Sequence, residues 1–240
     1  MRPRPSWSKA HRIGGFERSF ERYVRWLVRR SFAGVWLNRR AARLPSDGYV
    51  AIANHSSWWD GFIPYLLHRR QLPGSPFGLL MSDQELRRFP FFRWAGAFSI
   101  DNSSMRRARE AVVYAGEEAR RGVGVWMFPQ GWFAIDCEPR QFSSGFVHAA
   151  RRGAAAIVPV ALRFTMLEKQ RPEVFIDIAK PLRDIGRGTA RTAANIVCDR
   201  LRSIDDALRA RHVEADYVRF ITGASGVDAG FSSLLKRLRR

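Results

Sequence analysis

The sequence contains little lysine and little cysteine, and both shortages narrow the kinds of site it can build. Basic side chains number 41, but lysine occurs only at Lys9, Lys169, Lys180 and Lys236. The two cysteines, Cys137 and Cys198, belong to no spaced cluster of metal ligands, which argues against a zinc site. A pair of cysteines also gives no sign of a disulfide framework, and this suits a reducing compartment. We therefore expect no bound metal and no structural disulfide.

Long uncharged apolar runs are missing as well. A membrane-spanning helix needs roughly 18 such residues, and no stretch reaches that length. The best candidate, residues 26–37, is broken by Arg29 and Arg30. The N-terminal residues 1–5 are basic and rich in proline, without the apolar core of a cleaved signal peptide behind them. We expect a chain that lies on a membrane or avoids membranes, but does not cross one.

Acidic residues number only 22, which leaves a formal net charge of +19 and a sequence pI near 11.4. Such a charge favours an acidic partner, which could be nucleic acid, anionic lipid or an acidic carrier protein. Arginine suits bidentate contact with phosphate, although codon bias in a GC-rich genome explains the same composition. The arginines are spread along the chain without a nucleic-acid motif, so no specific nucleic acid is expected.

Strand and helix patterns alternate along the chain. Apolar runs of strand length occupy residues 49–53, 77–81, 97–100, 122–128, 154–164 and 174–178. Helical patterns occupy residues 59–70, 104–121, 145–152 and 189–211. This alternation predicts an α/β fold, namely a single domain with a mixed, mostly parallel sheet flanked by helices. In the run 174–178 apolar and polar residues alternate, which favours an edge strand.

An amphipathic helix is predicted over residues 16–38, with arginines on one side and large apolar residues on others. A basic, aromatic-rich helix is typical of an interfacial membrane element, and an ordinary core helix with a solvated basic face is the alternative. We expect a loose basic arm and membrane-surface helix over 1–40, a catalytic domain over 41–222, and a flexible basic tail over 223–240.

The strongest candidate for chemistry is the pair His55 and Asp60, which lies directly after the predicted strand 49–53. A turn between them would bring a carboxylate onto one imidazole nitrogen, which fixes the tautomer and makes the other nitrogen a base. That nitrogen can take a proton from a hydroxyl. Spacing alone is a weak signal, because a helix-capping aspartate near an unrelated histidine gives the same pattern.

Four blocks together resemble the glycerolipid acyltransferase family, which includes the lysophosphatidate acyltransferases. Residues 54–60, Asn-His-Ser-Ser-Trp-Trp-Asp, match its Asn-His-x-Ser-x-x-Asp signature. Residues 96–102, 128–131 and 158–160 resemble its second, third and fourth blocks in the family's order. The resemblance covers roughly residues 49–163, and the first and third blocks are the most specific.

The resemblance implies that His55 acts as general base on an acceptor hydroxyl, with Asp60 orienting it. The hydroxyl would attack an acyl thioester of coenzyme A or acyl carrier protein, with backbone amides around Gly131 stabilising the oxyanion. No covalent intermediate and no cofactor are required; Cys137, Ser56 and Ser57 are weaker candidate nucleophiles. The expected substrate-binding residues are Asn54, Ser57, Asn102, Arg106, Arg107, Phe128, Pro129, Gln130, Gly131, Arg140 and Ser143. Aromatic residues near the blocks, namely Trp58, Trp59, Phe62, Phe89, Phe91, Phe92 and Trp94, are expected to line an acyl channel or to pack in the core.

Three departures from the family bear on the acceptor. The third block usually has Glu where this chain has Gln130, the second usually ends in Arg where it has Asn102, and a downstream Lys position is Ser143. The missing Arg and Lys are associated with the acceptor's phosphate, so two charge-assisted contacts are lost. The nearby Arg106, Arg107 or Arg140 would have to replace them, or the acceptor carries no phosphate there.

We therefore expect acyl transfer to a lysophospholipid such as lysophosphatidate. The alternative is the same chemistry on a glycolipid, a glycosylated carotenoid or an ornithine-type lipid. A basic nucleic-acid-binding protein is the alternative of another class. An enzyme of this kind is expected on the cytoplasmic face of the membrane, as a peripheral or monotopic protein. Its partners would be an anionic membrane surface and the acyl donor, and the sequence does not indicate an oligomeric state.

Overall fold

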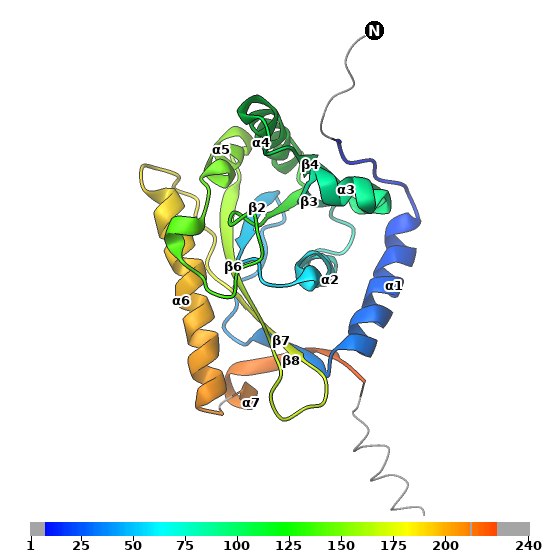
Figure 1. Cartoon of the computed structure of the whole chain (residues 1–240), viewed down its shortest axis with the longest axis vertical. Coiled ribbons are helices and arrows are strands. Elements are labelled where there is room, and N and C mark those ends of the chain that lie inside the picture. Colours follow the sequence, from blue (N-terminus) through cyan, green and yellow to red (C-terminus); the bar gives the residue numbers. More distant parts are fainter. Residues whose placement is uncertain (1–7, 212, 225–240) are drawn as a thin grey trace, which may run out of the picture.

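An eight-stranded sheet runs through the centre of the molecule, in the order β4-β3-β5-β2-β6-β7-β1-β8 (Figure 1). The computed structural model describes residues 8–211 and 213–224. The strands are β1 (Gly34–Asn38), β2 (Tyr49–Ala53), β3 (Phe77–Ser82), β4 (Ala97–Ile100), β5 (Gly124–Met127), β6 (Ala156–Thr165), β7 (Glu173–Ile178) and β8 (Tyr217–Thr222). Neighbours pair in parallel, except that β7 is antiparallel to β6 and β8 is antiparallel to β1. The predicted mixed, mostly parallel α/β sheet is confirmed.

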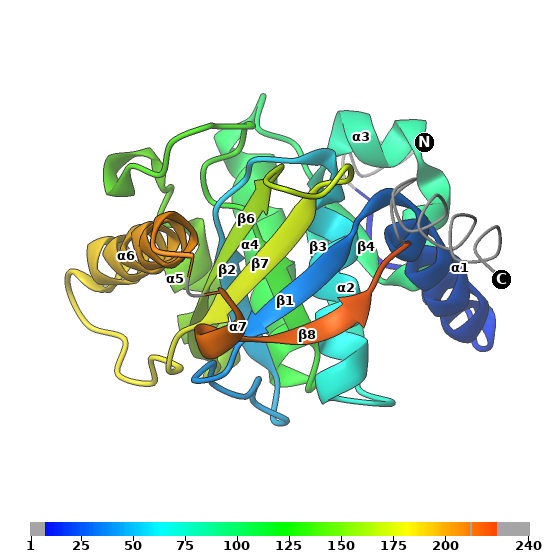
Figure 2. The ribbon, with the colours of Figure 1, turned by 90° about the horizontal axis from the view of Figure 1, so that it is seen from below.

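Helices cover both faces of this sheet, as Figures 1 and 2 show. They are α1 (Phe16–Ser31), α2 (Phe62–Gln71), α3 (Asp83–Arg88), α4 (Met105–Arg120), α5 (Gly145–Gly153), α6 (Thr189–Arg209) and α7 (Val213–Asp216). Short 3-10 turns are η1 (Trp58–Gly61), η2 (Pro90–Ala95) and η3 (Pro139–Gln141). One apolar core lies between the sheet and α1 with α2, and a second lies between the sheet and α4, α5 and α6.

Strand β2 shows why the central strands read as unbroken apolar runs. Tyr49, Ala51 and Ala53 belong to the core beneath α1 and α2, whereas Val50 and Ile52 belong to the core beneath α4 to α6. All five side chains are buried. Because helices cover both faces, neither face of the strand can carry an unpaired polar group.

The predicted helix over residues 16–38 is too long, because α1 ends at Ser31 and residues 34–38 form β1. Phe32 leaves the helix with extended backbone angles, and β1 then pairs with β7 on one side and β8 on the other. Backbone hydrogen bonds to two neighbouring strands therefore outweigh the local helical pattern. The sheet accordingly includes residues from before position 41.

The prediction of an edge strand at 174–178 is wrong. Strand β7 lies between β6 and β1, and all six of its residues are buried. Its polar side chains have hydrogen-bond partners in β1: Trp36 donates to Glu173 at 2.9 Å, and Asn38 donates to Asp177 at 3.1 Å. Polar alternation here reflects internal hydrogen bonding and not solvent exposure.

The N-terminal arm was expected to be loose, yet its described part packs on the domain. The Ser8 amide donates to the Ser99 hydroxyl at 2.7 Å, and Arg12 pairs with Glu118 at 2.7 Å. Residues 1–7 lie outside the described residues, as do residues 225–240 of the predicted tail. Within the described ranges, no helix is long and apolar enough to span a bilayer.

Candidate active site

The predicted site residues meet at one edge of the sheet because neighbouring strands point the same way. Strands β4, β3, β5, β2 and β6 are mutually parallel, so their carboxyl ends lie side by side. Strand β2 ends just before Asn54, and its neighbour β5 ends just before Phe128. The first and third sequence blocks are therefore adjacent, and the second block contains β4 and ends at the same edge.

His55 and Asp60 form the expected pair. The Nδ1 atom of His55 lies 2.8 Å from Oδ2 of Asp60. The same oxygen accepts the backbone N–H groups of Ser56 at 2.7 Å and Ser57 at 2.9 Å. Ser57 caps η1, since its hydroxyl accepts the Trp59 amide while Asp60 accepts the Ser57 amide, a capping box. This cap turns the chain so that the carboxylate faces back toward His55.

The geometry assigns a tautomer to His55. The Asp60 carboxylate is fully buried and, when ionised, can only accept, so the proton of the neutral imidazole sits on Nδ1. The basic lone pair is then on Nε2. The His55 side chain is 22% exposed and lines a cavity, so this base has access to a substrate. The arrangement can remove a proton from a bound hydroxyl.

A cavity of about 640 Å³ lies beside the imidazole. Most of its wall is apolar, as an acyl chain requires. The wall consists of His55, Trp58, Gly61, Phe62, Leu79, Leu80, Met81, Ser82, Glu85, Arg88, Phe89, Phe92, Ile100, Asn102, Val112, Met127, Phe128, Pro129, Gly131, Trp132, Phe133, Ser143, Gly145 and Phe146. Of the aromatic residues singled out in the sequence, Trp58, Phe62, Phe89 and Phe92 are part of this wall, whereas Trp59, Phe91 and Trp94 are not.

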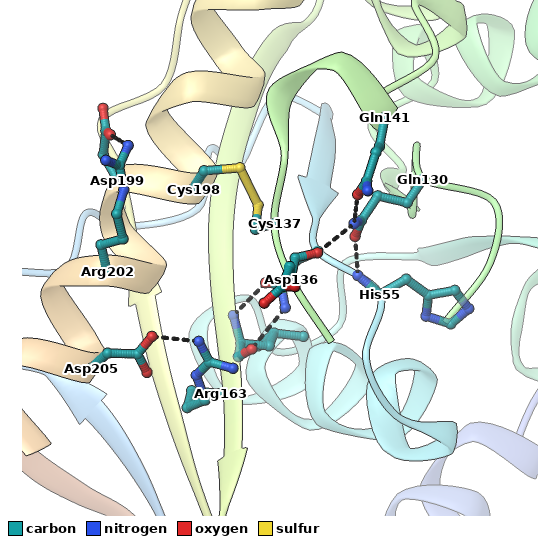
Figure 3. Close-up of a disulfide and its surroundings, with 12 residues drawn as sticks. His55, Gln130, Asp136, Cys137, Gln141, Arg163, Cys198, Asp199, Arg202 and Asp205 are labelled. Carbon is teal, nitrogen blue, oxygen red and sulfur yellow. Dashed lines mark hydrogen bonds and ion pairs between the residues drawn. A yellow bond between two sulfur atoms is a disulfide. The ribbon is translucent and has the colours of Figure 1, made fainter. Parts of the chain in front are cut away.

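The segment between β5 and α5, residues 128–144, encloses His55. The imidazole stacks on Phe128 with ring centroids 4.7 Å apart and lies 4.3 Å from the Phe133 ring. The His55 amide donates to Oε1 of Gln130 at 2.7 Å (Figure 3). The His55 carbonyl accepts the Ala134 amide at 2.8 Å. Both backbone polar groups of the histidine are therefore bonded to this one segment.

Comparison with known proteins gives the family. The chain matches the protein family described as Acyltransferase over residues 29–163, which is more than half of its length. The chain belongs to this family. It is therefore an enzyme that transfers acyl groups, and the predicted resemblance is confirmed.

One solved structure with a similar fold is the 1-acyl-sn-glycerophosphate (LPA) acyltransferase PlsC from Thermotoga maritima. The TM-score is 0.56 and the sequence identity 19%, over 79% of this chain and 78% of that chain. At this identity the likeness shows a shared fold. A search of the curated proteins finds no match to this chain.

Several residues of the acyltransferase that were expected to bind substrate have structural contacts instead. Asn54 is buried and pairs with both backbone groups of Leu162 in β6, at 2.9 Å each. Ser57 is the cap described above, and Gln130 is buried behind His55. None of these three is in the cavity wall, whereas Phe128, Pro129 and Gly131 are. The Gly131 N–H donates to the Phe128 carbonyl at 3.0 Å, and the oxyanion donors expected around Gly131 stay a prediction.

The three arginines expected to replace the missing phosphate contacts do not line the cavity of this acyltransferase. Arg106 pairs with Glu110 at 3.2 Å, and Arg140 pairs with Glu138. Arg107 pairs with Asp101 at 2.8 Å. Hydrogen bonds from Ser103 and Arg107 lower the pKa of Asp101 to about 2, so the partner of Arg107 stays charged. Asn102 and Ser143, in contrast, do line the cavity.

The two cysteines contradict the sequence prediction, because Cys137 and Cys198 form a disulfide with Cα atoms 5.3 Å apart (Figure 3). Their separation of 61 positions hid the pair, since only the fold brings residue 137 against α6. Cys137 is therefore not a free nucleophile. The inference of a reducing compartment also loses its premise.

Sequence reasoning missed many residues of the acyltransferase cavity wall, and three of them bear on its chemistry, namely Trp132, Phe133 and Arg88. Trp132 and Phe133 follow the third block directly, and Phe133 touches the His55 imidazole. The sequence feature that could have identified these two residues is their position next to Gly131, in a loop rather than in a helix or strand of the core. Arg88 in α3 is the arginine of the cavity wall, and only the packing of α3 against β4 brings it there.

Proposed function

We propose that this acyltransferase moves a fatty acyl group from a thioester of coenzyme A or acyl carrier protein to the hydroxyl of a lipid acceptor. The observation that supports this best is the His55–Asp60 pair, which is hydrogen-bonded at 2.8 Å and set in the wall of a largely apolar cavity. The cavity can hold an acyl chain, and the imidazole supplies the base.

The residues suggest a direct transfer. Nε2 of His55 accepts the proton of the acceptor hydroxyl while the oxygen attacks the thioester carbonyl. The tetrahedral intermediate then expels the thiolate, which takes the proton from the imidazolium. The Asp60 carboxylate keeps its hydrogen bond with Nδ1 and stabilises the transient positive charge on His55. A new ester and a free thiol result.

A lysophospholipid such as lysophosphatidate is the first candidate acceptor. The fold is shared with an enzyme whose name specifies 1-acyl-sn-glycerophosphate as acceptor. Arg88 in the cavity wall offers a cation for a phosphate, although Glu85 lies in the same wall.

An acceptor without a phosphate at this position is the second candidate. Its support comes from Asn102 and Ser143, which line the cavity where the family usually has cations. Arg106, Arg107 and Arg140 are each paired with a carboxylate outside that wall. Neutral hydrogen-bonding groups suit a sugar or an amide better than a phosphate dianion.

The two acceptors can be separated by acyl transfer from a labelled thioester to lysophosphatidate, a glycolipid and an ornithine-type lysolipid in parallel. Transfer to lysophosphatidate that falls in Arg88→Ala supports the first candidate. Transfer only to an uncharged head group, reduced by Asn102→Ala or Ser143→Ala, supports the second. In either case His55→Ala should abolish transfer, and full activity of that variant would exclude the proposed base.

The enzyme is further proposed to work at a membrane surface, as a peripheral or monotopic protein, and the cytoplasmic face stays a prediction that the cysteines no longer support. Helix α1 supports this, because it buries Phe20, Val24 and Val28 while Tyr23 and Trp26 remain more than half exposed. The net charge of +19 would attract an anionic leaflet or an acidic carrier protein.

A further inference from the structure

The contacts of Gln130 point to a role behind the catalytic histidine. Its side chain is 2% exposed and is not part of the cavity wall, so a substrate in the cavity would not touch it. Oε1 accepts the His55 amide at 2.7 Å. Nε2 donates to the Asp136 carbonyl at 3.3 Å and to Oε1 of Gln141 at 3.0 Å. One amide group thus joins His55 to two points of the segment 128–144.

These contacts determine which way the amide faces. The His55 amide is a donor and the Asp136 carbonyl is an acceptor, so only a carboxamide with its oxygen toward His55 satisfies both. A carboxylate at position 130 would still accept from His55 but would turn its second oxygen toward the Asp136 carbonyl. The Gln141 amide can rotate to donate, whereas a backbone carbonyl cannot. Glutamine and glutamate are therefore not equivalent at this position.

The disulfide anchors the other end of the same connection. Cys137 directly follows Asp136, and its partner Cys198 is buried in α6, which packs against β6. Figure 3 shows the sequence of contacts from α6 through the disulfide and Asp136 to Gln130 and then to the His55 backbone. Helix η3, which contains Gln141, also packs against α6. A disulfide and a buried amide thus connect α6 with the His55 backbone.

We propose that Gln130 is a positioning residue for His55 and that the Cys137–Cys198 disulfide acts on catalysis through it. The disulfide holds the Asp136–Gln141 stretch at the distance from which Gln130 can accept the His55 amide. Opening the disulfide lets this stretch move, and the imidazole then no longer keeps its orientation toward the acceptor hydroxyl. A test of this proposal by the rate of acyl transfer rests on the proposed function.

A double-mutant cycle tests the connection. Kinetics would be measured for Gln130→Ala, for the double variant Cys137→Ser and Cys198→Ser, and for all three changes combined. Each of the first two should lower kcat by about tenfold, the size of one lost buried hydrogen bond, with KM nearly unchanged. The kcat of the combined variant should be no lower than that of the less active of the two, because both changes break the same connection. Losses that multiply would overturn the proposal.

Two further variants separate positioning from general destabilisation. Gln130→Glu should recover part of the activity lost in Gln130→Ala, because its carboxylate still accepts the His55 amide. Gln71→Ala is a matched control, since Oε1 of Gln71 accepts the Leu44 amide at 2.9 Å at the far end of α2. It removes the same kind of bond and should leave kcat unchanged. A comparable loss in the control would show that the effect reports stability alone.

A second readout does not depend on acyl transfer. The ring signals of the five histidines can be followed by NMR, with that of His55 assigned from His55→Gln. Dithiothreitol reduces the disulfide to two thiols and is itself oxidised to its cyclic disulfide. In the wild type this should move the His55 signal, while that of the exposed His148 stays in place. An unmoved His55 signal in reduced enzyme and in Gln130→Ala would contradict the proposal even if the substrate were wrongly assigned.

Discussion

At the scale of single residues, Asp60 makes more contacts in the site than its spacing of five positions from His55 suggests. One of its oxygens accepts from the His55 ring and from two backbone amides at once. Its other oxygen, Oδ1, is buried without a hydrogen-bond partner among the described residues. A buried carboxylate with an unpaired oxygen costs stability, and this cost supports the chemical role proposed for Asp60.

Asp60→Asn should lower kcat by about 10²- to 10⁴-fold, the range associated with losing an oriented general base. The amide can still hold the backbone of residues 56 and 57, but it can also donate to Nδ1 and so favour the wrong tautomer of His55. Steady-state kinetics with a soluble thioester would check this. Asp47→Asn removes the same charge from an exposed pair with Arg183 and serves as the control. Equal losses in both variants would rule out the orienting role.

At the scale of elements, α1 has two kinds of surface. Phe20, Val24 and Val28 pack in the core between the sheet and α1 with α2. The interpretation of α1 as a core helix is therefore correct for that face. On another face Tyr23 and Trp26 stack on one another at 6.1 Å in solvent, and the Arg30 guanidinium lies 5.8 Å from the Trp26 ring. An aromatic pair beside arginines is the composition of an interfacial contact.

The double variant Tyr23→Glu and Trp26→Glu should bind vesicles that contain anionic phosphatidylglycerol at least about tenfold more weakly than the wild type, through loss of apolar insertion and added repulsion. Co-sedimentation would measure this. The matched control is Met166→Glu with Leu167→Glu, which adds the same charge at two exposed apolar residues between β6 and β7. Deleting residues 1–40 would not be a clean test, because it removes strand β1 from the sheet. Equal binding by the aromatic variant and the wild type would remove α1 as the membrane contact.

At the scale of the whole molecule, a buried histidine links stability to pH. His68 in α2 lies 2.8 Å from the Tyr49 hydroxyl through Nδ1 and 3.0 Å from the Ser75 carbonyl through Nε2. Only the neutral ring can accept from the tyrosine and donate to the carbonyl. Burial lowers the pKa of His68 to about 4 from an ordinary value of 6.5. The folded protein therefore excludes a proton that the unfolded chain accepts.

The contribution of His68 to the free energy of unfolding should be constant above pH 6.5. It should fall by about 3 kcal/mol as the pH drops to about 4. The direction follows because the unfolded state binds the extra proton throughout that window. Urea titrations between pH 4 and 7 would measure the slope. His68→Gln should flatten it, whereas His148→Gln at an exposed position should not. A wild-type slope that survives in His68→Gln would assign the effect to another group.

Local sequence determined the parts of this protein that depend on neighbours along the chain. The strand at 49–53, the helix at 104–121 and the His55–Asp60 pair are each encoded within a few residues, by burial on both faces, helical periodicity and a capping turn. Motif similarity across 49–163 likewise gave the family, from blocks that lie in or directly after strands β2, β4, β5 and β6. The sequence alone was therefore sufficient for the fold class and for the hydrogen-bonded His55–Asp60 contact, whose catalytic role stays a prediction.

Only the tertiary structure decided what depends on residues far apart in the chain. It turned residues 34–38 into a strand, because β7 and β8 supply hydrogen-bond partners from more than 130 positions away. It placed Gln130 behind His55 rather than in the cavity, and it paired Cys137 with Cys198 across 61 positions. The partners that stabilise such contacts lie far away in the chain, and no local pattern specifies them. The sequence therefore drew attention to these residues but did not predict their roles.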